Sequence, residues 1–496
     1  MKSLFLLLFI LLTFTSVNSQ TQDLENLAEG KMTYADILYD SDNNLYGYIY
    51  FFDQGKADSE NNQFEFILLD RNLNKLANGT YTEKYYDGIS SQFYDCTYMG
   101  EHIIFSKYLQ RKGELLLTFN RIISLADNSV SEEFIYENDE FKNLDTSESE
   151  LKKTYKKAES VNVTYAINHK NLNGFFVTEN NKKRKNFLEK DFKIYNSDKT
   201  LKWKFSYNPN GSKRDWNDFS VLNINEGMII GGVSHLANET WVDNYKIVGL
   251  DMENGTKLFE YHLEDKNSQY SHSVVVRYFG DKIYIVGNYS PYSKADFSWQ
   301  KNLGVYNITL DKNGNELSKK YHPWSEIASN LDANQYGVVK KGYYLTPMKI
   351  FVMKDGSFAY LAEKFKDNSA TIGAPKSSDF VLFNFDGNGD FKKNFVIEKD
   401  KTKWAKNDYL FHQYIKDNSG VVFFFRDYKK DNETKDKNWI LGINTILNGE
   451  FKQEVIPISS EDYFIQPIPA KEGYILLREY NEKNKFDQIR LERLNY

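Results

Sequence analysis

Four short runs in a row decide the fold of this chain: SHSVVVRYF (271–279), KIYIVGNY (282–289), LGVYNITLD (303–311) and LSKKYHPW (317–324). Each run is rich in β-branched and aromatic residues, which favour strands. The turns Gly280-Asp281 and Asn313-Gly314 join the first pair and the last pair, and a long polar and aromatic connector joins the pairs. This order is typical of one blade of a β-propeller.

The same pattern recurs along the chain at a spacing of roughly 50 to 55 residues. Other units open at 33–40, 92–99, 160–168, 218–225, 348–355, 410–417 and 463–470. The last unit holds only three runs, because the chain ends at Tyr496. We therefore expect an all-β propeller of eight four-stranded blades in one domain, residues 20–496. An N-terminal strand near Leu24 to Met32 would complete the last blade; seven blades, or a two-part or sandwich arrangement, are the alternatives.

Composition limits the functional classes. The formal net charge of -6, from 63 basic and 69 acidic residues, disfavours nucleic acid as a partner. The segment 1–19 has one early lysine, an apolar run and small residues near its end, which predicts a signal peptide. No later segment has the ~18 apolar residues of a membrane span. We expect an exported protein, secreted or periplasmic, that is monomeric. Cys96 is the single cysteine, so no intrachain disulfide can form.

Aromatic residues gather in the long connectors, which in a propeller lie on one face. Such side chains suit recognition of a glycan or a protein, because they offer large contact area at low entropic cost. The alternative is that each tryptophan wedges between blades. The candidate binding residues are Trp216, Trp241, Tyr289, Tyr292, Trp299, Trp324, Trp404 and Trp439.

Histidines and carboxylates give weaker indications of chemistry. His272 and His412 begin first strands, so they are the first histidines to consider for the rim of a central channel, but a structural hydrogen bond is the more common role of such a histidine. Asp386-Gly-Asn388-Gly-Asp390 resembles the start of a calcium loop, but Ile397 stands where a bidentate carboxylate is expected, and similar turns recur at Asp251 and Asp311. We expect no cofactor and no metal, with calcium as the alternative.

Some segments resemble known propeller repeats. KIVGLDMENGTKLFEY (246–261) and FKIYNSDKTLKWKF (192–205) are similar to quinoprotein-type repeats, and the IIGG at 229–232 resembles kelch repeats. The recurring tryptophans and the cysteine pair of the quinoproteins are absent, as is a repeated Gly-Gly. Taken whole, the chain resembles exported bacterial β-propeller proteins of unknown function. The sequence thus predicts a non-catalytic binding protein that uses its long-loop face; the alternative is a polysaccharide- or ester-cleaving enzyme with acids at the channel mouth.

Overall fold

A computed structural model of the chain confirms the all-β class. Eight antiparallel sheets form the eight blades of a β-propeller, and the only described α-helices are α2 (Glu148–Lys156) and α3 (Trp324–Ile327). Neither of these described helices is long and apolar enough to cross a membrane. The structure describes residues 21–137, 140–156, 165–178, 191–209, 215–225, 227–237, 240–265, 267–292, 301–367, 375–399, 408–430, 437–458, 464–481, 483 and 486–494.

The chain divides into two compact units. The first unit joins the two ends of the chain, Met1–Ile37, Leu45–Glu83 and Ser459–Tyr496. Its first blade contains β2 (Lys31–Tyr39), β3 (Leu45–Lys56), β4 (Asn61–Asp70) and β5 (Lys75–Lys84). Its other blade contains β33 (Phe464–Pro469), β34 (Tyr474–Asn481), β35 (Phe486–Arg493) and β1 (Thr21–Asp23).

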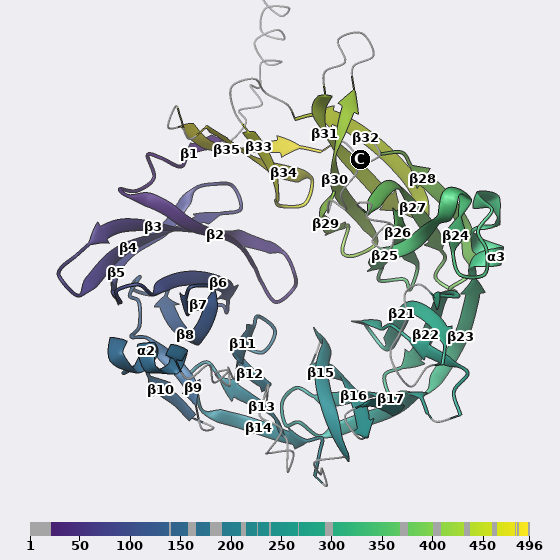
Figure 1. Ribbon diagram of the computed structural model, residues 1–496, viewed down its shortest axis with the longest axis horizontal. Helices are drawn as coiled ribbons and strands as arrows, with labels where there is room; N and C mark the ends of the chain where they lie inside the picture. Colours follow the sequence, from purple (N-terminus) through teal and green to yellow (C-terminus); the bar gives the residue numbers. More distant parts are fainter. Residues whose placement is uncertain are drawn as a thin grey trace, which may run out of the picture. The chain divides into compact units, whose positions relative to one another are not determined.

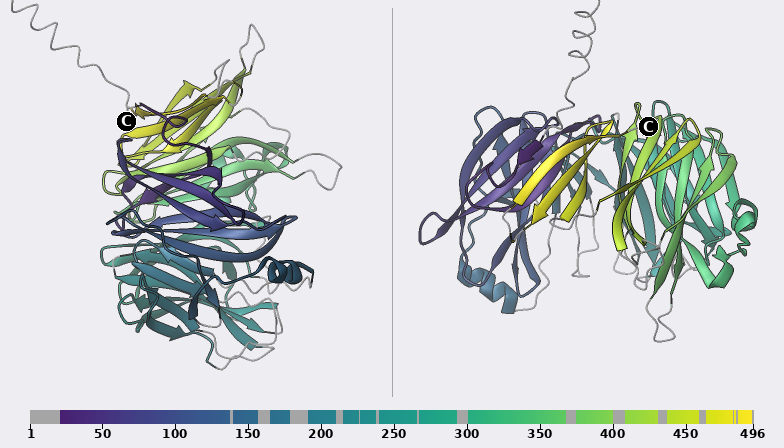
Figure 2. Two further views of the ribbon diagram at one scale, coloured as in Figure 1. Left: turned by 90° about the vertical axis from the view of Figure 1, so that its left-hand side faces the viewer. Right: turned by 90° about the horizontal axis from the view of Figure 1, so that it is seen from above.

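An N-terminal strand does complete the last blade, but it lies earlier than expected. The strand β1 pairs with β35, with Thr21 opposite Arg490 and Asp23 opposite Gln488. Both views of Figure 2 show this short purple strand beside the yellow strands of the C-terminus. Of the predicted segment, Leu24 to Gly30 form the link from β1 to β2, and Lys31 and Met32 begin β2. Leu24 anchors this link, because its side chain is buried and its N–H donates to the carbonyl of Asp487 at 2.8 Å.

We predict that Leu24→Ala lowers the free energy of unfolding by about 2 to 4 kcal/mol, because it leaves a cavity under the closing strand. Leu76→Ala is the matched control, since Leu76 is 50% exposed whereas Leu24 is 1% exposed. The control should change stability by less than about 0.5 kcal/mol. Urea denaturation of the two variants measures both values, and equal losses would contradict a closing role for Leu24.

The second unit, Leu38–Asn44 and Lys84–Ile458, contains the six remaining blades. Blade two contains β6 (Ser90–Tyr98), β7 (His102–Arg111), β8 (Glu114–Ser124), β9 (Phe134–Glu137) and β10 (Glu140–Asn143). Blade three contains β11 (Tyr165–His169), β12 (Gly174–Thr178), β13 (Asp191–Asn196) and β14 (Leu201–Ser206). Blade four contains β15 (Asp215–Asn225), β16 (Met228–Ala237), β17 (Thr240–Asp251) and β18 (Lys257–Glu264).

The blades that follow depart most from a regular pattern in their first strands. Blade five has a divided first strand, β19 (Tyr270–His272) and β20 (Val275–Phe279), then β21 (Lys282–Pro291), β22 (Gly304–Asp311) and β23 (Glu316–Pro323). Blade six contains β24 (Val338–Val339), β25 (Tyr343–Val352), β26 (Phe358–Lys366), β27 (Lys376–Phe385) and β28 (Phe391–Ile397). Blade seven contains β29 (Tyr409–Ile415), β30 (Gly420–Lys430), β31 (Lys437–Leu447) and β32 (Glu450–Pro457). Figure 1 shows these strands in chain order.

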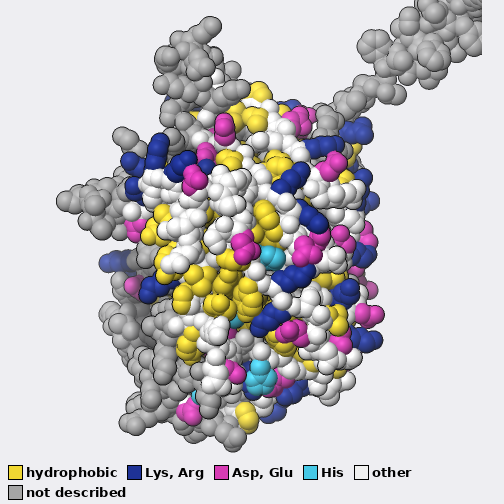
Figure 3. Space-filling view, turned by 90° about the vertical axis from the view of Figure 1, so that its right-hand side faces the viewer, with side chains coloured by type: hydrophobic (Ala, Val, Ile, Leu, Met, Phe, Trp, Pro, Cys, Tyr) yellow, Lys and Arg dark blue, Asp and Glu magenta, His cyan; other side chains and the backbone are white. Residues whose placement is uncertain are grey.

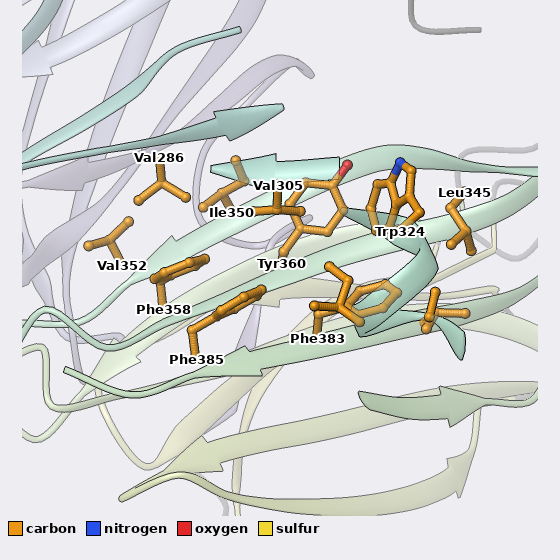
Figure 4. Close-up of a cluster of buried hydrophobic side chains, with 14 of the residues drawn as sticks. Val286, Val305, Trp324, Leu345, Ile350, Val352, Phe358, Tyr360, Phe383 and Phe385 are labelled. Carbon is orange, nitrogen blue, oxygen red and sulfur yellow. The ribbon is translucent and has the colours of Figure 1, made fainter. Parts of the chain in front are cut away.

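Hydrophobic cores join each blade of the second unit to the next. One core contains Val286 of blade five together with Phe358 and Phe383 of blade six, and Figure 4 shows these side chains between the two sheets. Equivalent clusters join blades two and three, three and four, four and five, and six and seven. Consecutive blades of this unit are therefore fixed side by side, which places their first strands in a defined order.

The outer strands leave some apolar side chains exposed. Figure 3 shows apolar side chains gathered in the middle of the face at the right of Figure 1, with charged side chains around them. Exposed apolar residues of the outer strands include Leu258 in β18, Leu317 in β23 and Val396 in β28. Nothing described in the structure covers these side chains, and we assign them no role.

Candidate functional site

A cavity of about 540 Å³ opens between the two blades of the first unit. Its size falls within the range of small-molecule sites, about 300 to 1,000 Å³. One wall is the strand β2 from Met32 to Ile37, and the opposite wall is β33 from Gln466 to Pro469. Tyr48, Tyr50 and Arg478 from the second strands complete the lining. The cavity therefore lies along the first strands of both blades.

A half-buried guanidinium, that of Arg478, forms one side of this cavity. The Nε of Arg478 donates to Oδ1 of Asp487 at 2.8 Å, and its Nη2 donates to Oδ2. Burial alone would lower the pKa of Arg478, but the hydrogen bonds and the charge of Asp487 raise it. Burial also raises the pKa of Tyr50, so both its hydroxyl and the guanidinium stay protonated. Among the described residues Nη1 has no hydrogen-bond partner, so it can donate to a ligand.

The cavity also presents acceptors and aromatic surface. The hydroxyl of Tyr34 donates to Oδ2 of Asp36 at 2.7 Å, which orients both side chains. The hydroxyl of Tyr48 donates to the carbonyl of Pro469 at 3.2 Å and ties the two blades together at the cavity. The exposed Gln466 adds an amide that can donate and accept. One cation, one carboxylate, one amide and tyrosine rings thus converge on a single space.

Sequence reasoning missed this cavity. Its two walls are separated by about 430 positions, and neither TYADILYD nor FIQPIP carries a recognisable motif. A signal was present, however, because two prolines in a first strand are unusual. Pro467 and Pro469 cannot donate hydrogen bonds to a neighbouring strand, which suits a strand at the edge of a sheet that faces open space.

The predicted aromatic binding residues lie in different environments. Trp324 is fully buried, with its ring 5.4 Å from that of Phe383 and 5.8 Å from that of Tyr360 (Figure 4). Tyr289 is buried in the core between blades four and five. Neither side chain presents surface to a ligand, and both correspond to the alternative in which an aromatic residue wedges between blades.

The other aromatic candidates are less deeply buried or not described. Trp216 is half-buried in β15 rather than in a connector, and Tyr292 is half-buried just after β21. Trp439 is half-buried in β31, with its ring against Tyr428 and the guanidinium of Arg426 4.7 Å from its centroid. Trp299 and Trp404 lie outside the described residues, as does the side chain of Trp241.

We predict that Trp324→Ala lowers the free energy of unfolding by about 3 to 5 kcal/mol, because it empties the core between blades five and six. Trp439→Ala is the control with the same chemical change, and it should cost about 1 kcal/mol from lost packing with Arg426. Thermal and urea unfolding of both variants measure this contrast. Similar losses in the free energy of unfolding of the two variants would contradict the conclusion that Trp324 is a core residue and Trp439 is not.

His272 belongs to a buried network and not to an open site. Its Nδ1 lies 3.2 Å from Oε1 of Glu264, its Nε2 lies 3.0 Å from the hydroxyl of Tyr321, and its side chain is 2% exposed. The pair resembles a base and its orienting carboxylate. However, the ring packs against Tyr306, and burial raises the pKa of Tyr321 to about 12. The satisfied structural histidine is the arrangement found.

His412 is held in its neutral form. Burial, followed by the charges of Lys349 and Arg277, lowers its pKa to about 3. Its Nδ1 lies 2.9 Å from the hydroxyl of Tyr409, and its ring packs against Phe351. The neighbouring positive charges mark this residue as different from His272.

We predict that His412 makes stability depend on pH. A histidine of the unfolded chain titrates near 6.5, so between pH 6.5 and about 3 the unfolded state binds a proton that the native state does not. The free energy of unfolding should therefore fall by up to about 1.4 kcal/mol per pH unit as the pH decreases. Urea titrations at pH 7 and pH 5 should show a smaller difference for His412→Gln than for the unmodified protein. The exposed His262 gives the control His262→Gln, and an equal difference in all three proteins would contradict the prediction.

A second charged cluster lies buried where blade six passes to blade seven. The ammonium of Lys399 lies 2.6 Å from Glu363 and 2.7 Å from Asp408. Burial, only partly offset by Lys399, raises the pKa of Glu363. A buried ammonium group needs carboxylate partners, so this cluster holds the chain in place where it passes from blade six to blade seven.

The turn that resembles a calcium loop docks one blade on another. Oδ1 of Asp386 accepts hydrogen bonds from the backbone N–H groups of Asn388 and Asp390, and Oδ2 lies 2.6 Å from the ammonium of Lys392. Lys320 of blade five lies 2.6 Å from the carboxylate of Asp390. Both carboxylates thus have lysine partners. In the part of the chain that the structure describes, no group of three or more His, Cys, Asp or Glu side chains is placed to hold a metal ion.

Comparison with other proteins gives a family and distant likenesses. The model of a family described as a family of unknown function, DUF6770, matches residues 1–378. No curated protein matches the chain. A prolyl endopeptidase structure has 8% identity and a TM-score of 0.39 over 91% of this chain, and the chain spans 54% of that protein.

Two further structures are similar at the same low level. The β-propeller domain of the trilobed protease from Pyrococcus furiosus has 12% identity and a TM-score of 0.34, over 86% of this chain and 96% of that chain. An endo-arabinase from Bacteroides thetaiotaomicron has 9% identity and a TM-score of 0.22, over 54% of this chain and 90% of that chain. Likeness at this level carries no argument about function. The particular resemblance to quinoprotein and kelch repeats is not confirmed.

Proposed function

Because this chain belongs to DUF6770, a family of unknown function, we propose its function from its own site: it is an exported protein that binds a glycan in the cavity of the first unit. The observation that carries the proposal is the convergence of Arg478, Asp36 and Gln466 with tyrosine rings around one open space of about 540 Å³. The signal-like segment at the N-terminus supports export.

The lining suits a sugar ring in two respects. Tyrosine rings pack against the apolar face of a sugar, while hydroxyl groups need donors and acceptors in alternation. Arg478 supplies donors, Asp36 supplies acceptors, and Gln466 supplies both. Because Arg478 and Tyr34 are already held by Asp487 and Asp36, little side-chain ordering remains to oppose binding.

We propose binding rather than cleavage because of the number of carboxylates that line the cavity. Retaining and inverting glycosidases need two carboxyl groups about 5 to 10 Å apart. Among the described residues that line the cavity, Asp36 is the one carboxylate. The histidine and carboxylate pair of His272 and Glu264 is buried and satisfied within the second unit. The long connectors that were expected to bind a ligand lie partly outside the described residues, so the proposal rests on the cavity.

We predict that Gln466→Ala and Asp36→Asn each weaken binding by about tenfold, since the first removes an amide and the second replaces one accepting carboxylate oxygen with a donor and removes the charge. A glycan array would first identify the ligand, and calorimetric titration would then compare the variants. Gln453→Ala is the matched control for Gln466→Ala, because Gln453 is an exposed glutamine on the outer strand β32.

Three outcomes would change the proposal. Absence of any bound glycan, or equal affinity of the Gln466 and Gln453 variants, would exclude the cavity as a glycan site. Release of new reducing ends from the bound glycan would favour the polysaccharide-cleaving alternative.

A further inference from the structure

The surface of the last blade that borders the cavity continues beyond the cavity. Arg478 of β34 lines the cavity, whereas neither of its chain neighbours, Leu477 and Glu479, does. Side chains alternate between the two faces of a sheet, so Tyr480, two residues further along β34, lies on the same face as Arg478. The guanidinium carbon of Arg478 is 5.1 Å from the centroid of the Tyr480 ring. This ring therefore lies directly beside the cation of the cavity.

A phenylalanine stands opposite this tyrosine. Phe464 of β33 pairs with Tyr480, and Gln466, which lines the cavity, pairs with Arg478, with no register shift between the two pairs. Because paired residues of an antiparallel sheet share a face, the two pairs follow one another along one surface. The rings of Phe464 and Tyr480 have centroids 5.5 Å apart and planes inclined by 31°. We call these two rings the aromatic platform.

The ring of Phe464 is open to solvent. Phe464 is 71% exposed, which is the highest value for a large apolar side chain among the described residues. Other exposed apolar residues, such as Leu258 of β18 and Leu317 of β23, lie on outer strands, whereas Phe464 lies on a first strand. A single exposed apolar side chain needs no explanation. This ring, however, is held by Tyr480 and extends a surface that already lines a cavity.

The cavity also contains a buried hydroxyl that lacks a partner. Tyr50 lines the cavity and is 3% exposed, and its hydroxyl has no hydrogen-bond partner among the described residues. Tyr48, two residues earlier on β3 and on the same face, donates to the carbonyl of Pro469 across the cavity, so Tyr50 also faces the last blade. A buried hydroxyl costs free energy unless it is hydrogen-bonded. A hydroxyl group of a sugar in the cavity supplies that hydrogen bond.

We propose that the glycan site has two subsites, one in the cavity and one on the aromatic platform, so that its ligand is a chain of at least two sugars. This inference rests on the proposed function. One sugar of the chain occupies the cavity and hydrogen-bonds with Gln466, Arg478 and Tyr50. The next sugar lays its apolar face on the ring of Phe464, which offers contact area at low entropic cost.

The spacing of the two cross-strand pairs fits one continuous ligand. They lie about 7 Å apart along the strands, which is twice the rise per residue of a strand. An apolar ring and a set of hydrogen-bonding groups thus stand side by side on one surface. Each sugar of a chain has both an apolar face and several hydroxyl groups, so two linked sugars satisfy both parts at once.

Binding of single sugars and of chains tests the proposal. A glycan array holds glucose, galactose, mannose, xylose, N-acetylglucosamine and galacturonate, each as the monosaccharide and as a tetramer of the same sugar. Calorimetric titration then measures the Kd of the best monosaccharide and its tetramer. Phe464→Ala should weaken binding of the tetramer by at least about fivefold and that of the monosaccharide by less than about twofold.

Matched variants separate stacking from other effects. Phe464→Tyr keeps an aromatic ring and should keep the affinity for the tetramer, whereas Phe464→Leu is apolar without such a ring and should lose most of the gain. Tyr94→Ala removes a ring that is 62% exposed on β6 of the second unit, and it should change neither Kd. All four variants should keep the Tm of the unmodified protein, because both side chains are exposed.

Fluorescence reports contact with the platform directly. The indole introduced by Phe464→Trp should change its emission when the tetramer is added, and it should change much less when the monosaccharide is added at the same saturation. Emission that responds equally to the two probes would overturn a separate platform subsite.

The outcomes distinguish this inference from the proposed function. An unchanged Kd of Phe464→Ala for the tetramer, while Gln466→Ala still weakens its binding, would overturn the platform subsite and leave the cavity as a glycan site. Equal weakening of the monosaccharide and the tetramer by Phe464→Ala would also overturn it. If no sugar of the array binds in either form, the proposed function fails and the platform subsite fails with it.

Discussion

Packing of one blade against the next is the interaction on which the structure depends. Each antiparallel sheet has two apolar faces, and between consecutive blades of the second unit hydrophobic clusters cover these faces. The side chains at these interfaces are large: Trp324 and Tyr360 meet between blades five and six, and Phe351 and Phe423 stack at 5.3 Å between blades six and seven. With Cys96 as its single cysteine, the chain has no intrachain disulfide to replace this burial.

The packing of one blade against the next also explains why glycines stand in the turns. Gly255 of blade four lies against the indole of Trp203 of blade three, and an added Cβ would come within 2.4 Å of that ring. Gly314 of blade five lies against Phe259 of blade four in the same way. Both glycines also have positive φ. Each position therefore favours glycine for two reasons, the close aromatic ring and the backbone conformation. The turns at Gly255, Gly314 and Asp386 are therefore docking points between blades.

Buried polar groups have a related role where the chain passes from an outer strand to the next first strand. Glu264 holds His272 at one crossover, and Lys399 holds Asp408 at another. Such pairs look like catalytic constellations, yet their side chains are almost fully buried. Each of these groups has a hydrogen-bonding or oppositely charged partner, as a buried charge requires. The cavity proposed to bind a ligand differs, because Nη1 of Arg478 has no hydrogen-bond partner among the described residues.

The sequence by itself determined the class, the strand pattern and the incomplete last blade, because alternating aromatic and β-branched runs and glycine turns act locally. It also predicted that an N-terminal segment would supply the missing strand, although not that Thr21–Asp23 would be that segment. Only the tertiary structure decided which aromatic residues are core, as Trp324 is, and which remain partly exposed, as Trp439 is. It alone joined β2 to β33 around a cavity, because this arrangement links strands far apart in the chain and depends on how whole blades pack.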